Sequence, residues 1–187
     1  MLVLVITKLE LGAGLRPTRG YQHHDQYPHP HIEHLGDPWM LDLPTASLDE
    51  VLALAFIEHL TYEQALDTFR NVKRMLKPSG VFLFDVPDYP IWTAYYLAHI
   101  QEMPKLREKL GDELPDIDLC RQTLFGWGRF PGDSHLYGWD TDHLAAALTE
   151  CGFDPTFTDS SLFRSRAYRR RFGEAWNAHL YVQALPT

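Results

Sequence analysis

The chain has 187 residues, of which 45% are hydrophobic and 13% aromatic, and its formal net charge is −8. This length and composition predict one compact domain over residues 1–187, and the acidic balance argues against a protein that coats nucleic acid. Residues 1–6 are too short for a signal peptide or membrane span, and the two cysteines lack metal-ligand spacing, so we expect a cytoplasmic protein without a membrane partner.

Short apolar stretches alternate with helical stretches, which is typical of a parallel sheet covered by helices. The expected strands are 2–11, 21–25, 32–36, 50–55 and 81–86, followed by a closing pair at 154–163 and 178–184. Helices are expected at 62–76, where apolar residues recur every three or four positions, and at 142–151, before Gly152. We therefore predict an α/β fold whose sheet is mostly parallel, with a closing antiparallel strand.

The first strand ends in an acidic residue and a Gly-x-Gly turn, in the run Lys8-Leu9-Glu10-Leu11-Gly12-Ala13-Gly14. Glycine at both ends of the turn removes the Cβ atoms that would hinder close approach of a ligand to the backbone. Glu10 can accept a hydrogen bond from a cationic or hydroxylated ligand at the carboxyl end of its strand. The turn predicts a cofactor site, although such turns are common.

Three further segments follow the Gly-x-Gly turn along the chain. The first, 20–25, is a short strand ending in Asp25, and the second runs from Gly36-Asp37-Pro38-Trp39 to Phe56-Ile57-Glu58-His59-Leu60. The third is 72–80, in which we interpret Lys77-Pro78-Ser79-Gly80 as a turn that leads into the strand 81–86 and Pro87-Asp88. In order and content, residues 8–90 resemble the class I S-adenosylmethionine-dependent methyltransferases, in particular a small bacterial and viral branch. Ser79 stands where that branch more usually has glycine.

The resemblance implies a Rossmann-like class I methyltransferase sheet that binds S-adenosylmethionine at the carboxyl ends of its strands. The implied cofactor-binding residues follow the first four strands: Glu10, Gly12, Ala13, Gly14, Asp25, Asp37, Pro38, Trp39, Ala55 and Phe56. The first four would hold the methionine part, and Asp25 would accept from both ribose hydroxyls. Asp37, Pro38 and Trp39 would surround the adenine, and Ala55 and Phe56 would lie near the sulfonium.

The connections between the first three strands are unusually short. About eight residues separate the first strand from the second and about six separate the second from the third, whereas a parallel crossover needs a dozen or more. We therefore expect loops in place of helices, because Pro17, Pro28 and Pro30 suit extended backbone.

Residues 89–133 form an insertion rich in aromatic side chains, with a charged helical piece expected at 105–110. The resemblance implies an acceptor pocket or lid here, with Tyr95 as an acceptor-binding residue, although the aromatics could simply cover the sheet. Because no helix precedes the first strand, either this insertion or a second subunit must cover the cofactor, which leaves a homo-oligomer open.

Methyl transfer is an in-line displacement at a sulfonium, so positioning supplies most of the acceleration and a base matters chiefly for a hydroxyl acceptor. The candidate bases are His59, His135 and Asp88, and the segment around His135 also resembles the family's H-x-Y stretch. Glu58-His59 could instead only cap the helix that follows. A metal site is not predicted among the histidines of 23–34, because His23 and His24 point to opposite faces of their strand.

Five arginines fall within residues 164–171 of this acidic chain. They could form a solvated loop, or Arg169, Arg170 and Arg171 could steer an anionic acceptor, because guanidinium groups match phosphate geometry. We predict methyl transfer to a hydroxyl or amine of a small, anionic or sugar-like acceptor. A non-catalytic S-adenosylmethionine-binding subunit is the alternative, and a nucleic acid base is not favoured as acceptor.

Overall fold

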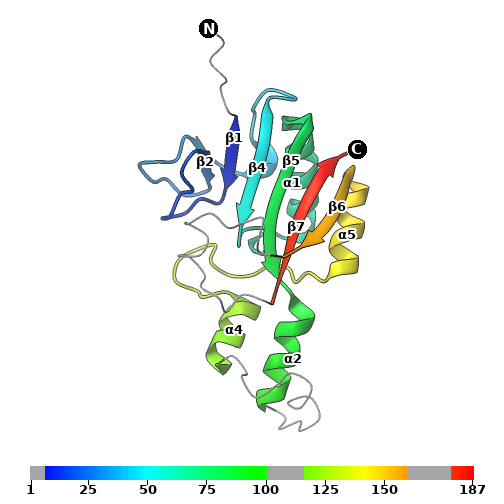
Figure 1. The fold of residues 1–187 in the computed structure, drawn as a ribbon. Coiled ribbons are helices and arrows are strands. Elements are labelled where there is room, and N and C mark those ends of the chain that lie inside the picture. The colour runs from blue at the N-terminus through cyan, green and yellow to red at the C-terminus, as the bar shows by residue number, and fades with distance from the viewer. Residues whose placement is uncertain (1–6, 101–115, 160–177) are drawn as a thin grey trace.

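The computed structural model describes residues 7–100, 116–159 and 178–187. In these ranges one seven-stranded sheet has the order β3-β2-β1-β4-β5-β7-β6 (Figure 1). Its strands are β1 Lys8–Leu11, β2 Gln22–Asp25, β3 His34–Leu35, β4 Leu48–Leu54, β5 Leu76–Pro87, β6 Phe153–Thr158 and β7 His179–Pro186. The first five pair in parallel, and β7 runs antiparallel to β5 and β6. The predicted fold class is confirmed.

The main core lies between the sheet and two helices, α1 Tyr62–Met75 and α5 Thr141–Glu150. Helix α1 begins with a capping box, in which the Thr61 side chain accepts from the Gln64 backbone N–H and the Gln64 side chain accepts from the Thr61 N–H. Its Phe69 ring packs against the rings of Phe82 and Phe84 in β5, with centroids 6.1 and 5.9 Å apart. Both predicted helices are confirmed within a residue of their ends.

The short connections are loops, as predicted. Between β1 and β2, and between β2 and β3, the backbone forms turns and bends rather than helices. The first loop is tied to the sheet because Thr18 donates to the buried Glu10 carboxylate from its backbone N–H, at 2.6 Å, and from its hydroxyl, at 2.8 Å. After β3, the chain continues into the short 3-10 helix η1 Pro38–Met40.

Several strand boundaries differ from the prediction. Strand β5 begins at Leu76, so Lys77-Pro78-Ser79-Gly80 lies inside a strand and is not the predicted turn. Leu76 pairs with Leu48, and a register shift before Glu50 absorbs the irregular segment. Strand β4 begins two residues earlier than expected, and β3 is only two residues long. Strand β6 ends at Thr158, and residues 2–6 and 160–163 of the predicted strands lie outside the described ranges.

The insertion contributes two helices, α2 Tyr89–Ile100 and α4 Ile117–Phe125, which lie beyond the carboxyl end of β5 (Figure 1). They share a small apolar cluster built around Trp92, Cys120 and Leu124. The predicted charged piece at 105–110 lies outside the described residues. Among the described helices, none combines the length and the apolar character that crossing a membrane requires.

Candidate functional site

Acidic residues stand at the carboxyl ends of three adjacent strands, where parallel sheets bind ligands. Glu10 lies in β1, Asp25 ends β2, and Asp37 follows β3. The Asp25 carboxylate accepts from the backbone N–H groups of Gly14 and Tyr27, at 2.8 and 2.9 Å. Each of its oxygens still has acceptor capacity, because a carboxylate offers about four lone-pair sites.

The Gly-x-Gly turn is left-handed at both glycines, with φ of +65° at Gly12 and +56° at Gly14. A Cβ atom at position 12 would lie 2.2 Å from Cδ2 of Phe56, so Gly12 is required by the packing of that ring. A Cβ atom at position 14 would meet only the Gly12 carbonyl oxygen, 4.0 Å away. The backbone is therefore open to close approach on the side of Gly14 where a Cβ atom would lie.

The residues after β4 are held by a buried pair that the sequence did not predict. The Ala55 N–H donates to Oδ1 of Asp85 at 3.0 Å, and Ala55 has a left-handed φ of +47°. Nδ1 of His179 lies 2.8 Å from the other Asp85 oxygen. Asp85 thereby fixes the bend that turns Phe56 onto Gly12. A carboxylate inside the apolar run of β5 was the available sequence signal.

The predicted adenine-side residues are anchored to the scaffold. Pro38 is buried, and its carbonyl accepts from the Asn71 side chain of α1 at 2.9 Å. Trp39 is half-buried against the main core. Oδ1 of Asp37 accepts from the Gln26 side chain at 2.8 Å.

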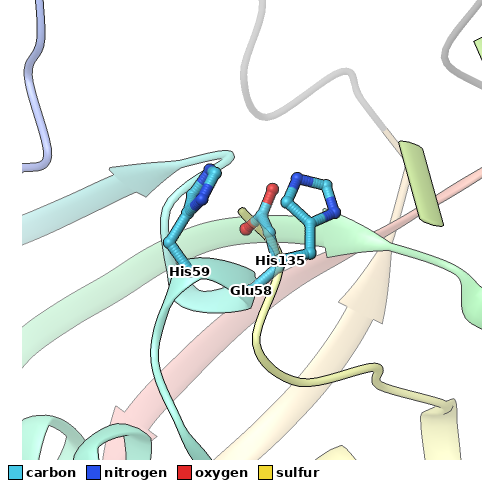
Figure 2. Close-up of side chains that lie close together, drawn as sticks. All are labelled: Glu58, His59 and His135. Carbon is cyan, nitrogen blue, oxygen red and sulfur yellow. The ribbon is translucent and has the colours of Figure 1, made fainter. Parts of the chain in front are cut away.

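Two of the candidate bases meet at this edge. His59 ends the 3-10 helix η2 Ile57–His59, directly after β4. The Glu58 carbonyl accepts from the backbone N–H groups of Leu136, at 2.8 Å, and Tyr137, at 3.3 Å, which brings His135 beside η2. The two imidazole ring centroids are 4.8 Å apart and nearly perpendicular. Figure 2 shows the Glu58 carboxylate between the two rings.

Both imidazoles are neutral at pH 7. Burial lowers the pKa of His59, and burial together with repulsion from His59 lowers the pKa of His135 to about 4. Nδ1 of His59 donates to the Ser134 carbonyl at 3.1 Å, which leaves the lone pair on Nε2. The pair can therefore accept hydrogen bonds or bind a cation.

The loop that carries His135 also reaches the end of β2. Within it, the Asp133 carboxylate accepts from the backbone N–H of Arg129 at 2.9 Å and from its guanidinium at 2.8 and 2.9 Å. Phe130 packs edge-on against Tyr27, with centroids 6.4 Å apart, and Tyr27 is two residues after Asp25. One loop thus connects the histidine pair to the end of β2.

Two of the remaining candidates, Asp88 and Tyr95, belong to the segment that follows β5. Asp88 begins α2, where Oδ1 accepts from the Ile91 N–H at 3.3 Å, and burial raises its pKa. Tyr95 packs within the insertion cluster, against Trp92. Arg169, Arg170 and Arg171 lie outside the described residues.

Comparison with known proteins identifies the class. A family model described as "Methyltransferase domain" matches residues 19–84. No curated protein matches the chain. An S-adenosylmethionine-dependent methyltransferase from Mesorhizobium loti has a similar structure, with a TM-score of 0.55 and 20% identity over 96% of this chain and 90% of that chain. The CcbJ methyltransferase from Streptomyces caelestis gives a TM-score of 0.57 and 15% identity, over 98% and 84%.

A third similar structure, a DhpI-SAH complex, has a TM-score of 0.55 and 12% identity over 96% of this chain and 76% of that chain. The fold is the one found in these S-adenosylmethionine-dependent methyltransferases. Residues 19–84 match the methyltransferase-domain model, and the predicted resemblance to the class I family is confirmed.

Proposed function

We propose that the chain transfers a methyl group from S-adenosylmethionine to a hydroxyl or amine of a small, anionic or sugar-like acceptor. The observation that carries this proposal is the position of the His59–His135 pair, at the same sheet edge as Asp25 and the Gly12–Gly14 turn. Bound S-adenosylmethionine supplies the methyl group as an electrophilic sulfonium. The residues of the chain hold the two reactants in line and accept the proton of the hydroxyl or amine.

The cofactor would lie along the acidic strand ends. Glu10, Ala13 and the two glycines would face its methionine part, and Asp25 would accept from the ribose hydroxyls. Asp37, Pro38 and Trp39 would border the adenine, and Ala55 and Phe56 the sulfonium. The open backbone at Gly14 and the spare acceptor capacity of Asp25 support this assignment.

The acceptor would approach from the loop 126–138 and the insertion, with Tyr95 as a candidate contact. His59 and His135 would receive the hydrogen bond of the acceptor group, since both imidazoles are neutral. Asp88 remains a candidate base at the end of β5.

Asp25→Ala is expected to weaken S-adenosylmethionine binding by about 1.5–3 kcal/mol, the range for lost hydrogen bonds to a charged group. This corresponds to a roughly 10- to 150-fold higher Kd in titration calorimetry. Asp67→Ala is the matched control, because Asp67 is exposed on α1 and pairs with Arg70 on the surface. An unchanged Kd in Asp25→Ala would remove this residue from the site.

Replacing Arg169, Arg170 and Arg171 together by serine is expected to raise the acceptor Michaelis constant by roughly tenfold, because charge-assisted hydrogen bonds to an anion are lost. The wild-type constant should also rise with salt. Steady-state kinetics with Arg70→Ser as control measures both effects. Identical constants in wild type and triple variant would show that these arginines do not bind the acceptor.

The test of the function is a methyl-transfer assay with methyl-labelled S-adenosylmethionine and a panel of phosphorylated sugars, nucleotide-linked sugars, amines and nucleic acid ends. Transfer to an anionic hydroxyl or amine compound supports the proposal. Cofactor binding without transfer to any acceptor would favour the alternative, a non-catalytic S-adenosylmethionine-binding subunit.

A further inference from the structure

Glu58, His59 and His135 form a three-residue cluster at the carboxyl edge of the sheet. One side-chain ligand atom from each residue lies within 4.8 Å of the other two. Figure 2 shows the three side chains converging, with two coming from η2 and one from the loop before α5. The carboxyl group belongs to a residue that is only 1% exposed, which is rare for glutamate, and it lies between the two imidazoles.

Backbone hydrogen bonds hold the two segments of this cluster together. The Glu58 carbonyl accepts from Leu136 and Tyr137, as described above, and the His135 N–H donates to the Phe125 carbonyl at 3.2 Å. Gly126 and Ser134 form a further antiparallel bridge in the same loop. The three side chains are therefore preorganised, which lowers the entropic cost of closing around a ligand.

The hydrogen bonds of the two rings suit metal ligation. A ligating histidine usually donates its other ring N–H to a carbonyl or carboxylate. His59 has this arrangement, with Nδ1 donating to the Ser134 carbonyl at 3.1 Å. Within the described residues, Nδ1 of His135 is buried without a hydrogen-bond partner.

The donor atoms of the cluster indicate which ion it would take. Two imidazole nitrogens and one carboxylate are the donor set of catalytic zinc sites, whereas magnesium and calcium prefer oxygen donors throughout.

We infer that Glu58, His59 and His135 bind one divalent transition-metal ion, with zinc as the preferred ion. Three protein ligands leave at least one coordination position for an outside oxygen. Where the chain acts as the methyltransferase proposed above, that position would take the acceptor oxygen, so this part of the inference rests on the proposed function. Ligand atoms around tetrahedral zinc are about 3.3 Å apart for bonds of about 2.0–2.1 Å, so the side chains must close by about 1.5 Å.

The test uses the full chain after treatment with EDTA and dialysis. Titration with Co²⁺ should give visible d–d absorption that saturates at one ion per chain and is abolished by one equivalent of Zn²⁺. Glu58→Gln, His59→Ala and His135→Ala should each weaken Zn²⁺ binding by about 100-fold or more, as expected for loss of one of three ligands. His34→Ala is the matched control, because this histidine lies on β3 and contacts Gln22. Circular dichroism checks that each variant is folded.

Absence of saturable Co²⁺ or Zn²⁺ binding by the wild type overturns the inference, whatever the variants do. Equal Zn²⁺ affinity in folded His34→Ala, His59→Ala and His135→Ala would place any bound ion elsewhere and also overturns it. Metal binding and methyl transfer are scored separately. If the protein binds one ion but methylates no acceptor, the metal site stands and the proposed function is wrong. If it transfers methyl groups but binds no metal, the proposed function stands and the metal site is wrong.

Discussion

His59→Ala and His135→Ala are each expected to lower turnover by about 10²-fold or more when the acceptor is a hydroxyl, while the Kd for S-adenosylmethionine stays nearly unchanged. The centroids of the two rings lie 4.8 Å apart, and neither residue is among those proposed to bind the cofactor. Single-turnover kinetics and titration calorimetry on the same preparations measure the two quantities. His34→Ala should retain wild-type values in both.

The same kinetics separate two roles for the histidine pair. If His59 and His135 act through a bound metal, wild-type protein treated with EDTA should lose activity to about the level of the variants and recover it when zinc is added. If they act as a base alone, EDTA should have no effect. Full activity in both alanine variants would contradict both roles. The base would then be Asp88, or catalysis would depend on positioning of the reactants alone.

Gly12→Ala is expected to lower the free energy of unfolding by about 2–5 kcal/mol. The left-handed backbone costs a non-glycine residue roughly 1–2 kcal/mol, and overpacking against Phe56 adds about 1–3 kcal/mol. Gly14→Ala is the matched control, because it has a similar φ but its Cβ atom meets nothing closer than 4.0 Å. Its expected loss is therefore about 1–2 kcal/mol.

Urea denaturation followed by circular dichroism measures both losses. Because both glycines have a left-handed backbone, the difference between the two losses in unfolding free energy reports the contact of residue 12 with Phe56. Equal losses in the two variants would mean that Phe56 moves aside at no cost, and that Gly12 is not fixed by this packing.

The sequence predicted the parts of the fold that depend on local patterns. The apolar period of α1 and the capping residues Thr61 and Gln64 specify that helix, and alternating apolar stretches specify the central strands. At 77–80 the same kind of local pattern gave a wrong prediction, because Pro78 and Gly80 indicated a turn. Pairing of Leu76 with Leu48 draws this segment into β5, because tertiary pairing outweighs weak turn propensity.

The candidate site could be predicted only residue by residue. The acids after β1, β2 and β3 were found because each ends a recognisable strand. That His59 and His135 meet depends on backbone hydrogen bonds from Leu136 and Tyr137 to Glu58, across the whole middle of the chain. The Asp85–His179 contact likewise joins residues 94 positions apart. The spacing of residues within one helix or strand does not predict contacts between residues so far apart in the sequence.

The most direct test of the account is a crystal structure of the protein grown with S-adenosylhomocysteine. The account predicts that its methionine part lies against the Gly12–Gly14 turn, its ribose hydroxyls donate to Asp25, and its adenine lies beside Asp37, with the sulfur facing the edge that holds His59 and His135. A ligand bound away from the carboxyl ends of β1 and β2, or no bound ligand at millimolar concentration together with no heat of binding in solution, would contradict it.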